Sequence, residues 1–276
     1  MFDPKKRNHH IQYAQNFLNN PSLARYVVGL SNITSNDSVV EIGPGKGMLT
    51  NILIKKCRHL TLVEKDRELA LELRQRYAEA PTVKIIHADA LQFRTEEANY
   101  KVFSNPPFNI LSQVIKKFVF AKNAPQEMYL FMQKEAQQRL SGKSGENQLS
   151  ILIKSFYTLK ELHKFKPSDF SPVPSIDVNL IGFYSKSGNP ILPVDKQEYI
   201  LFVQFGFQQQ KATLEKNFDK VFTHEQWKRL AKDLNFSLKS LPTDLKPDHW
   251  IGLFRFYKIG VTPEKQRIVQ AFAPRK

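Results

Sequence analysis

Short apolar segments alternate with helix-like segments through the first half of the chain, and this alternation constrains the fold more than any other feature. Four segments rich in Val, Ile, Leu and Phe fit buried strands: residues 38–42, 60–64, 83–87 and 100–104. The residues between them, notably 46–56 and 66–78, have helical spacing. Strands and helices in this rhythm predict an α/β fold with a doubly wound, mostly parallel sheet.

Three further apolar runs are predicted to complete the sheet: residues 127–133, 150–157 and 178–184. We expect the last two to form an antiparallel pair at one edge. From Asp195 onward the apolar residues follow helical spacing, with Trp227, Leu230 and Leu234 on one face. The predicted division is an α/β domain over residues 1–187 and a small all-α domain over residues 188–276.

Charge indicates the kind of partner. The 276 residues include 41 Lys and Arg against 26 Asp and Glu, a net charge of +15 that attracts polyanions. The chain has neither an apolar run of about 18 residues nor a signal-peptide pattern at its start, so we expect nucleic acid rather than a membrane as the partner. The single cysteine, Cys57, excludes an intramolecular disulfide and fits a reducing cytoplasm. We expect a cytoplasmic monomer.

A glycine-rich segment, residues 41–47, follows the first predicted strand, at the edge where open α/β sheets bind cofactors. Acidic residues end three successive predicted strands: Glu41, Glu64 and Asp89. Three acids suit a pyrophosphate poorly, but they suit an adenosine joined to a cationic sulfonium and an ammonium. We therefore favour S-adenosylmethionine over NAD. The alternative for any one of these acids is a solvated helix cap.

The segment Asn105-Pro106-Pro107-Phe108 follows the fourth predicted strand. The lone pair of an aromatic amine is delocalised into its ring, so the amine attacks poorly unless acceptors hold its N–H bonds. An Asn side chain and the next backbone carbonyl supply two acceptors, the prolines stiffen the loop, and a Phe ring can stack on an extruded base. The alternative is a proline turn with Phe108 in the core, and the tetrapeptide alone does not decide between the two.

Six segments together resemble the ribosomal RNA adenine N6-dimethyltransferases in order and spacing: residues 15–18, 41–47, 64–66, 89–90, 105–108 and 170–174. The family has a small-subunit branch linked to kasugamycin sensitivity and a large-subunit branch linked to erythromycin resistance. Residues 202–207 and 245–254 look like the erythromycin-resistance proteins. We therefore expect methylation of an adenine in 23S ribosomal RNA, with resistance of the macrolide–lincosamide–streptogramin B type.

The resemblance implies a Rossmann-like, S-adenosylmethionine-dependent methyltransferase domain and a role for each matching residue. Asn105, the carbonyl of Pro106, and Phe108 are the expected catalytic groups, and Phe170 and Phe17 are expected to bind the flipped adenine. The residues expected to hold the cofactor are Gln15, Asn16, Leu18, Glu41, Gly43, Gly45, Gly47, Glu64, Lys65, Asp89, Ala90 and Asn105. Lys65 stands where the family commonly has an apolar residue, and its aliphatic stem can cover the adenine face.

The expected reaction is direct in-line attack of adenine N6 on the methyl carbon, without a general base. We expect no metal, since the seven histidines lack ligand spacing. A basic tract, Lys5-Lys6-Arg7, and further lysines are candidates to guide RNA phosphates, or else are solvated surface charges: Lys116, Lys117, Lys154, Lys164 and Lys166.

Other functions stay open. The first is methylation of 16S ribosomal RNA in ribosome biogenesis, and a second is DNA adenine methylation, because Asn-Pro-Pro-Phe also serves that chemistry. A third is a noncatalytic RNA-binding or transcription factor on the same fold. The presence of Glu64, Asp89 and Asn105 argues against the third.

Overall fold

The computed structural model describes residues 16–208 and 211–273, which form two compact units. The first unit holds the described residues up to Gln137 together with Leu159–Ser185. The second holds Gln138–Thr158 and the described residues from Lys186 onward. The predicted change of domain near residues 187 and 188 lies close to the crossing at Ser185. The second unit, however, also contains the segment Gln138–Thr158, which the sequence-based division left in the first domain.

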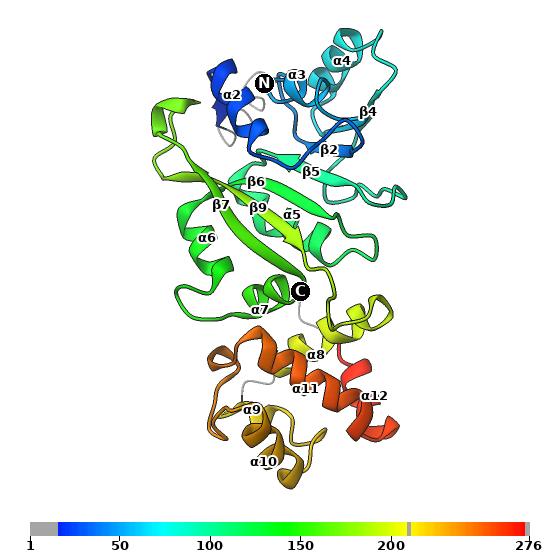
Figure 1. Cartoon of the computed structure of the whole chain (residues 1–276), viewed down its shortest axis with the longest axis vertical. Helices are drawn as coiled ribbons and strands as arrows, with labels where there is room; N and C mark the ends of the chain where they lie inside the picture. The colour runs from blue at the N-terminus through cyan, green and yellow to red at the C-terminus, as the bar shows by residue number, and fades with distance from the viewer. Residues whose placement is uncertain (1–15, 209–210, 274–276) are drawn as a thin grey trace, which may run out of the picture. The chain divides into compact units, whose positions relative to one another are not determined.

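A seven-stranded sheet organises the first unit, with the strand order β4-β3-β2-β5-β6-β9-β7. The strands are β2 (Ser38–Ile42), β3 (His59–Glu64), β4 (Val83–His87), β5 (Lys101–Ser104), β6 (Glu127–Gln133), β7 (Tyr157–Lys164) and β9 (Val178–Ser185). The five from β2 to β6 pair in parallel, whereas β9 runs antiparallel to β6. In Figure 1 the colour of these strands changes along the chain from blue at β2 to yellow-green at β9. The predicted doubly wound sheet with an antiparallel edge is confirmed.

The central strands are apolar because helices cover the sheet. In β2, Val39, Val40 and Ile42 are buried, as is every residue of β5. The chain moves outward from β2 through β3 and β4 and then returns to place β5 on the other side of β2. The strand order therefore reverses between β2 and β5, which is where open α/β sheets bind ligands.

The helical segments of the first unit are α2 (Pro21–Gly29), α3 (Thr50–Leu53), α4 (Arg67–Arg76), the 3-10 turn η1 (Phe108–Ile110), α5 (Leu111–Val119) and the 3-10 turn η2 (Pro167–Asp169), and α6 (Lys134–Ser141) follows β6. The helix predicted over residues 46–56 is much shorter than expected. Gly45 and Gly47 have φ of +54° and +80°, outside the range of an α-helix, so residues 45–49 form turns and α3 begins only at Thr50. The second predicted helix is α4, and Asp66 caps it by accepting from the backbone N–H groups of Glu68 and Leu69.

The prediction of a strand over residues 150–157 is wrong, because all of these residues except Tyr157 belong to helix α7 (Gln148–Phe156). Asn147 caps the helix, and its backbone N–H donates to the Ser150 hydroxyl, which completes a capping box. Most of the helix is buried, and its apolar residues Leu149, Ile151, Leu152, Ile153 and Phe156 lie close together in the sequence. A short apolar run of this kind does not distinguish a buried strand from a buried helix. The strand follows directly, as β7.

The C-terminal part of the second unit is helical, as predicted. Its segments are η3 (Pro193–Asp195), α8 (Lys196–Gln208), α9 (Leu214–Asn217), α10 (His224–Asp233), η4 (Pro242–Asp244), α11 (Pro247–Gly260) and α12 (Pro263–Gln270). Aromatic rings fill its core. The Phe202 ring lies 4.8 Å from that of Phe218, and Phe207 stacks on Trp250 at 5.3 Å. Trp227 and Trp250 are both buried, and Trp227 lies with Leu230 on the buried face of α10, as predicted.

No helix in residues 16–208 or 211–273 is long and apolar enough to cross a membrane.

Candidate active site

The carboxyl ends of β2 and β5 are joined side by side. Ile42 pairs with Ser104 in the parallel ladder, and the Ser104 hydroxyl donates to the Ile42 carbonyl at 2.8 Å. The glycine loop that leaves β2 and the Asn105 loop that leaves β5 therefore begin next to each other. Two segments that are far apart in the sequence meet at the point where the strand order reverses.

The glycine loop adopts a backbone that only glycine accepts readily. Gly43, Gly45 and Gly47 all have positive φ, at +64°, +54° and +80°. The Gly45 N–H donates to Glu64 Oε2 at 3.1 Å, and the Asp66 N–H donates to Glu64 Oε1 at 2.9 Å. Glu64 is only 6% exposed, so these bonds fix its carboxylate against the loop.

Glu41 lies beneath this loop and is fully buried. Its carboxyl accepts from the Thr50 hydroxyl at 2.7 Å, which ties the end of β2 to the start of α3. Burial raises the pKa of Glu41 to about 8, the Thr50 hydrogen bond opposes this shift, and the charge of Glu64 adds to it. Glu41 therefore acts as a buried support for the loop and carries a proton at neutral pH.

Asp89 follows β4 and forms an ion pair with Lys65. The Lys65 ammonium lies 2.8 Å from Asp89 Oδ2, and the Leu91 N–H donates to Oδ1 at 2.9 Å. The hydrogen bond from Lys65 lowers the pKa of Asp89, as does the one from Leu91. Ala90 is buried beside it. The structure thus brings Glu64, Lys65 and Asp89 to neighbouring strand ends, as the sequence predicts.

Asn105 is 7% exposed at the end of β5, and its side-chain Nδ2 donates to the Asn16 carbonyl at 2.6 Å. This bond directs the amide oxygen, Oδ1, away from Asn16. Pro106 is buried, and the Pro107 carbonyl accepts from the Ile110 N–H at 3.1 Å, which starts η1. The loop is therefore held at both of its ends, by the strand and by the 3-10 turn.

The N-terminal segment runs beside this loop as strand β1 (Phe17–Leu18), paired with β8 (Phe170–Ser171). A Cβ on Gly45 would lie 2.5 Å from the Phe17 ring, so Phe17 packs directly on the glycine loop. Asn16 and Leu18 flank it, which brings these predicted residues to the site. Gln15 lies outside the described residues.

The two predicted base-binding rings lie in different surroundings. Phe108 is partly buried and packs against the core. Phe170 is only 1% exposed, with its ring 5.1 Å from Phe165 and 6.3 Å from Phe131. In this structure Phe170 is part of an aromatic cluster, and stacking of a base on it requires β8 to shift.

Two residues that the sequence did not single out brace the glycine loop from outside. Arg76 Nη1 donates to the Lys46 carbonyl at 2.6 Å, and the Tyr77 hydroxyl donates to Asn51 at 2.7 Å. A Cβ on Gly47 would lie 3.1 Å from each of these side chains. Both residues stand at the end of α4, and no local pattern marks an exposed helix-end arginine as a support for a distant loop.

We find no metal-binding cluster among the described residues. The part of the chain that the structure describes contains no group of three or more His, Cys, Asp or Glu side chains that could hold an ion.

Comparison with known proteins shows the family of the chain. Residues 6–258 match the family model described as Ribosomal RNA adenine dimethylase. The chain belongs to this family. S-adenosylmethionine is its methyl donor, and the chain is a ribosomal RNA adenine N6-methyltransferase. The structure fits this cofactor, because backbone N–H groups fix Glu64 beside a glycine loop at the edge where α/β sheets bind nucleosides.

Two relatives are each named Ribosomal RNA small subunit methyltransferase A. The one from Pelagibacter ubique is 32% identical over 254 residues, 88% of this chain and 95% of the relative. The one from Maridesulfovibrio salexigens is 32% identical over 252 residues, 88% of this chain and 94% of the relative. The crystal structure of 23S rRNA methyltransferase ErmE has a TM-score of 0.73 and 19% identity, covering 88% of this chain and all of that one.

These comparisons bear on the expected branch. The similarity to ErmE shows a shared fold, whereas the higher sequence identity is to proteins named for the small subunit. The expectation of a large-subunit, erythromycin-resistance enzyme is therefore not supported, and the alternative fits better. The two segments behind that expectation, residues 202–207 and 245–254, lie in or beside α8 and α11, where they supply core aromatics. Packing of this kind carries no information about which RNA is bound.

Proposed function

We propose that this dimethylase-family chain methylates the N6 amine of adenine in small-subunit ribosomal RNA. One observation carries the proposal of the reaction site: the Asn105 amide is fixed by Asn16 at the end of β5, directly beside the glycine loop that leaves β2. The names and the identity of the two relatives support the small subunit as the target.

In the proposed mechanism, Asn105 Oδ1 and the Pro106 carbonyl accept hydrogen bonds from the two N–H groups of the adenine N6. The bond from Asn105 Nδ2 to Asn16 decides which end of the amide is the acceptor. S-adenosylmethionine supplies an electrophilic methyl group on its sulfonium. As positive charge develops on N6, the two carbonyl acceptors stabilise it, and the rigid loop avoids the cost of reorienting them.

The cofactor is proposed to lie along the strand ends. Glu64 accepts from the ribose hydroxyls, Asp89 and the backbone of Ala90 contact the adenine, and the stem of Lys65 covers its face. The methionine part lies by Gly43, Gly45 and Gly47. Glu41 supports the loop from below, and Asn16 and Leu18 line the N-terminal side.

For the target base, Phe108 is the proposed stacking surface, because it follows Asn105 by three residues and is only partly buried. Phe17, whose ring packs on Gly45, is proposed to border the same place. Phe170 contributes to base binding once β8 shifts. Extrusion of a base from a looped RNA strand costs a few kcal/mol, which such stacking offsets.

The test is methylation of purified small and large ribosomal subunits with tritiated S-adenosylmethionine. We expect label in the small-subunit RNA. Asn105→Ala should lower it by about 10²–10³-fold, and the matched control Asn109→Ala, an exposed residue of the adjoining turn η1, should retain it. Label confined to large-subunit RNA would contradict the proposed target and restore the erythromycin-resistance branch. Cofactor binding with no label in either RNA would favour the noncatalytic reading.

A further inference from the structure

Helix α2 presents an outward stripe that neither the cofactor site nor the catalytic loop uses. Its buried face consists of Ala24, Val27 and Val28. The residues of the opposite face are exposed: Ser22, Arg25, Tyr26 and Gly29. Tyr26 is 54% exposed, so a large aromatic ring and a cation share one turn of the solvent side.

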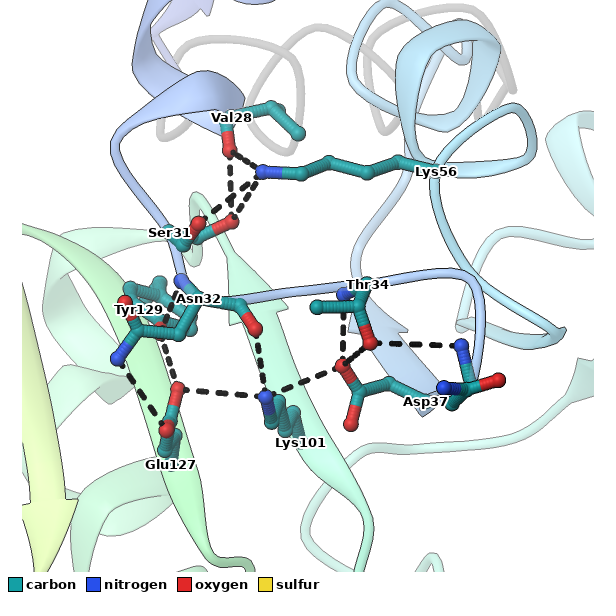
Figure 2. Close-up of polar contacts among 10 residues, drawn as sticks. Val28, Ser31, Asn32, Thr34, Asp37, Lys56, Lys101, Glu127 and Tyr129 are labelled. Carbon is teal, nitrogen blue, oxygen red and sulfur yellow. Dashed lines mark hydrogen bonds and ion pairs between the residues drawn. The ribbon is translucent and has the colours of Figure 1, made fainter.

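The helix is anchored at both ends. Asn20 caps its start by accepting from the backbone N–H groups of Ser22 and Leu23. At its other end, the Lys56 ammonium donates to the Val28 carbonyl at 2.8 Å and to the Ser31 carbonyl at 3.0 Å (Figure 2).

The segment that follows α2 is anchored too. The Lys101 ammonium donates to the Asn32 carbonyl at 2.7 Å, and the Asn32 N–H donates to the Tyr129 hydroxyl at 2.8 Å (Figure 2). Lys101 and Tyr129 belong to the central strands β5 and β6. Tyr26 is therefore mounted on a rigid support, and a ligand that stacks on it does not have to order the helix first.

A row of rings leads from Tyr26 to the proposed base site. The Tyr26 ring contacts the His163 ring at 5.5 Å with an interplanar angle of 75°, and His163 contacts Phe165 at 4.7 Å. Phe165 in turn lies 5.1 Å from Phe170, which pairs with Leu18. Figure 1 shows α2 beside the segment between β7 and β8. The exposed ring thus stands at the border of the site rather than on a remote surface.

The charge around these rings is positive. Arg25 precedes Tyr26, and exposed lysines accompany His163 along β7 and the turn after it: Lys160, Lys164 and Lys166. Lys164 lies 3.5 Å from Glu161, which offsets one of them. Cations beside a rigidly held aromatic ring are the combination that binds single-stranded nucleic acid, through the phosphates and the bases respectively.

We propose that Tyr26, backed by His163, is a stacking platform for a nucleotide that flanks the target adenine in the substrate RNA. This inference rests on the proposed function. A flipped adenine leaves its neighbours without a stacking partner, and the Tyr26 ring replaces that partner. Arg25 contacts the phosphate of the same strand. The platform holds the substrate strand and takes no part in methyl transfer.

The test compares Tyr26→Ala, Tyr26→Leu and Tyr26→Phe. RNA affinity is measured by fluorescence anisotropy with labelled small-subunit ribosomal RNA, KM and kcat by methyl transfer, and cofactor affinity by calorimetry. Stacking on one ring predicts about a tenfold increase in the RNA Kd and KM for the Ala and Leu variants. We expect kcat and the cofactor Kd to stay within twofold, and Tyr26→Phe to match the wild type. Leu71→Ala, an apolar side chain 45% exposed on α4, is the control and should change nothing.

Two results would contradict the proposal that Tyr26 is a stacking platform. Unchanged RNA affinity in Tyr26→Ala would show that the ring does not contact RNA, and wild-type affinity in Tyr26→Leu would show that apolar area suffices without a ring. The anisotropy measurement separates this inference from the proposed function. If the wild-type protein binds the RNA but methylates nothing, the proposed function fails, while the Tyr26 variants still decide about the platform.

Discussion

At the scale of single residues, the position of one amide oxygen decides whether the chain can do its chemistry. Asn105→Ala removes the acceptor Oδ1 and leaves the glycine loop and the acids in place. We expect methyl transfer to fall by about 10²–10³-fold, the usual effect of losing one transition-state hydrogen-bond partner. The cofactor Kd should stay within about threefold. Single-turnover methylation and calorimetry measure the two quantities, and the exposed neighbour Asn109→Ala serves as the control. Equal losses in both variants would contradict this role.

Glu41 makes the stability of the first unit depend on pH. Its pKa is raised to about 8 by burial, so between the ordinary carboxyl pKa and pH 8 the unfolded chain releases a proton that the folded chain keeps. The free energy of unfolding should therefore fall as pH rises through this window, by about 1.4 kcal/mol per pH unit at most. Above pH 8 both states are ionised and the contribution is constant.

Glu41→Gln should remove that slope, because glutamine does not titrate. Urea unfolding at several pH values between 5.5 and 8 measures it in both proteins. Parallel pH profiles for Glu41→Gln and the wild type would show that the carboxyl is not protonated in the folded state.

At the scale of secondary-structure elements, the end of β3 and the end of α4 both support the glycine loop. Glu64, just before the helix, accepts from the Gly45 N–H, and Arg76, at its end, donates to the Lys46 carbonyl. We expect Arg76→Ala to raise the Kd for S-adenosylmethionine by about threefold to tenfold, since one such hydrogen bond contributes about 0.5–1.5 kcal/mol.

Calorimetric titration of the cofactor measures this effect, and Arg76→Lys should recover part of the affinity. Arg74→Ala changes an exposed arginine of the same helix and provides the control. If the Arg76 and Arg74 variants bind the cofactor equally well, the loop does not depend on this brace.

The cap at the start of α7 favours helix over strand for residues 150–156. The Asn147 side chain accepts from the N–H groups of Leu149 and Ser150, at 3.0 Å each. Replacement of such a cap by alanine costs about 1 kcal/mol, so Asn147→Ala should lower the free energy of unfolding by that amount, and Asn147→Asp should keep most of it. Urea unfolding measures both. A strand in this region would make the two variants equally stable.

At the scale of the whole molecule, the parts that follow from local pattern were predictable. Alternating strands and helices, with glycines and acids at the strand ends, indicate the sheet and the place of its site, because parallel strands meet at one edge. The hydrogen bond from Asn105 to the Asn16 carbonyl was not predictable, since every residue has a backbone carbonyl and the residue type does not indicate which one accepts. Neither was the Arg76 brace, nor the burial of Phe170 by Phe165 and Phe131.

The choice of RNA was not predictable either. Aromatic residues at helical spacing in the second unit fill its core, and core packing does not indicate which RNA is bound. Sequence identity along the whole chain, rather than any one segment, favours the small subunit.

The central claim is that the loop after β5 binds the N6 amine of a substrate adenine and orients it for methylation. The most direct measurement is mass spectrometry of nucleosides from ribosomal RNA incubated with the protein and S-adenosylmethionine. We predict N6-methylated and N6,N6-dimethylated adenosine, with both formed about 10²–10³-fold more slowly by Asn105→Ala. A methylated cytidine, guanosine or ribose, or adenosine methylated on a ring nitrogen, would contradict the account.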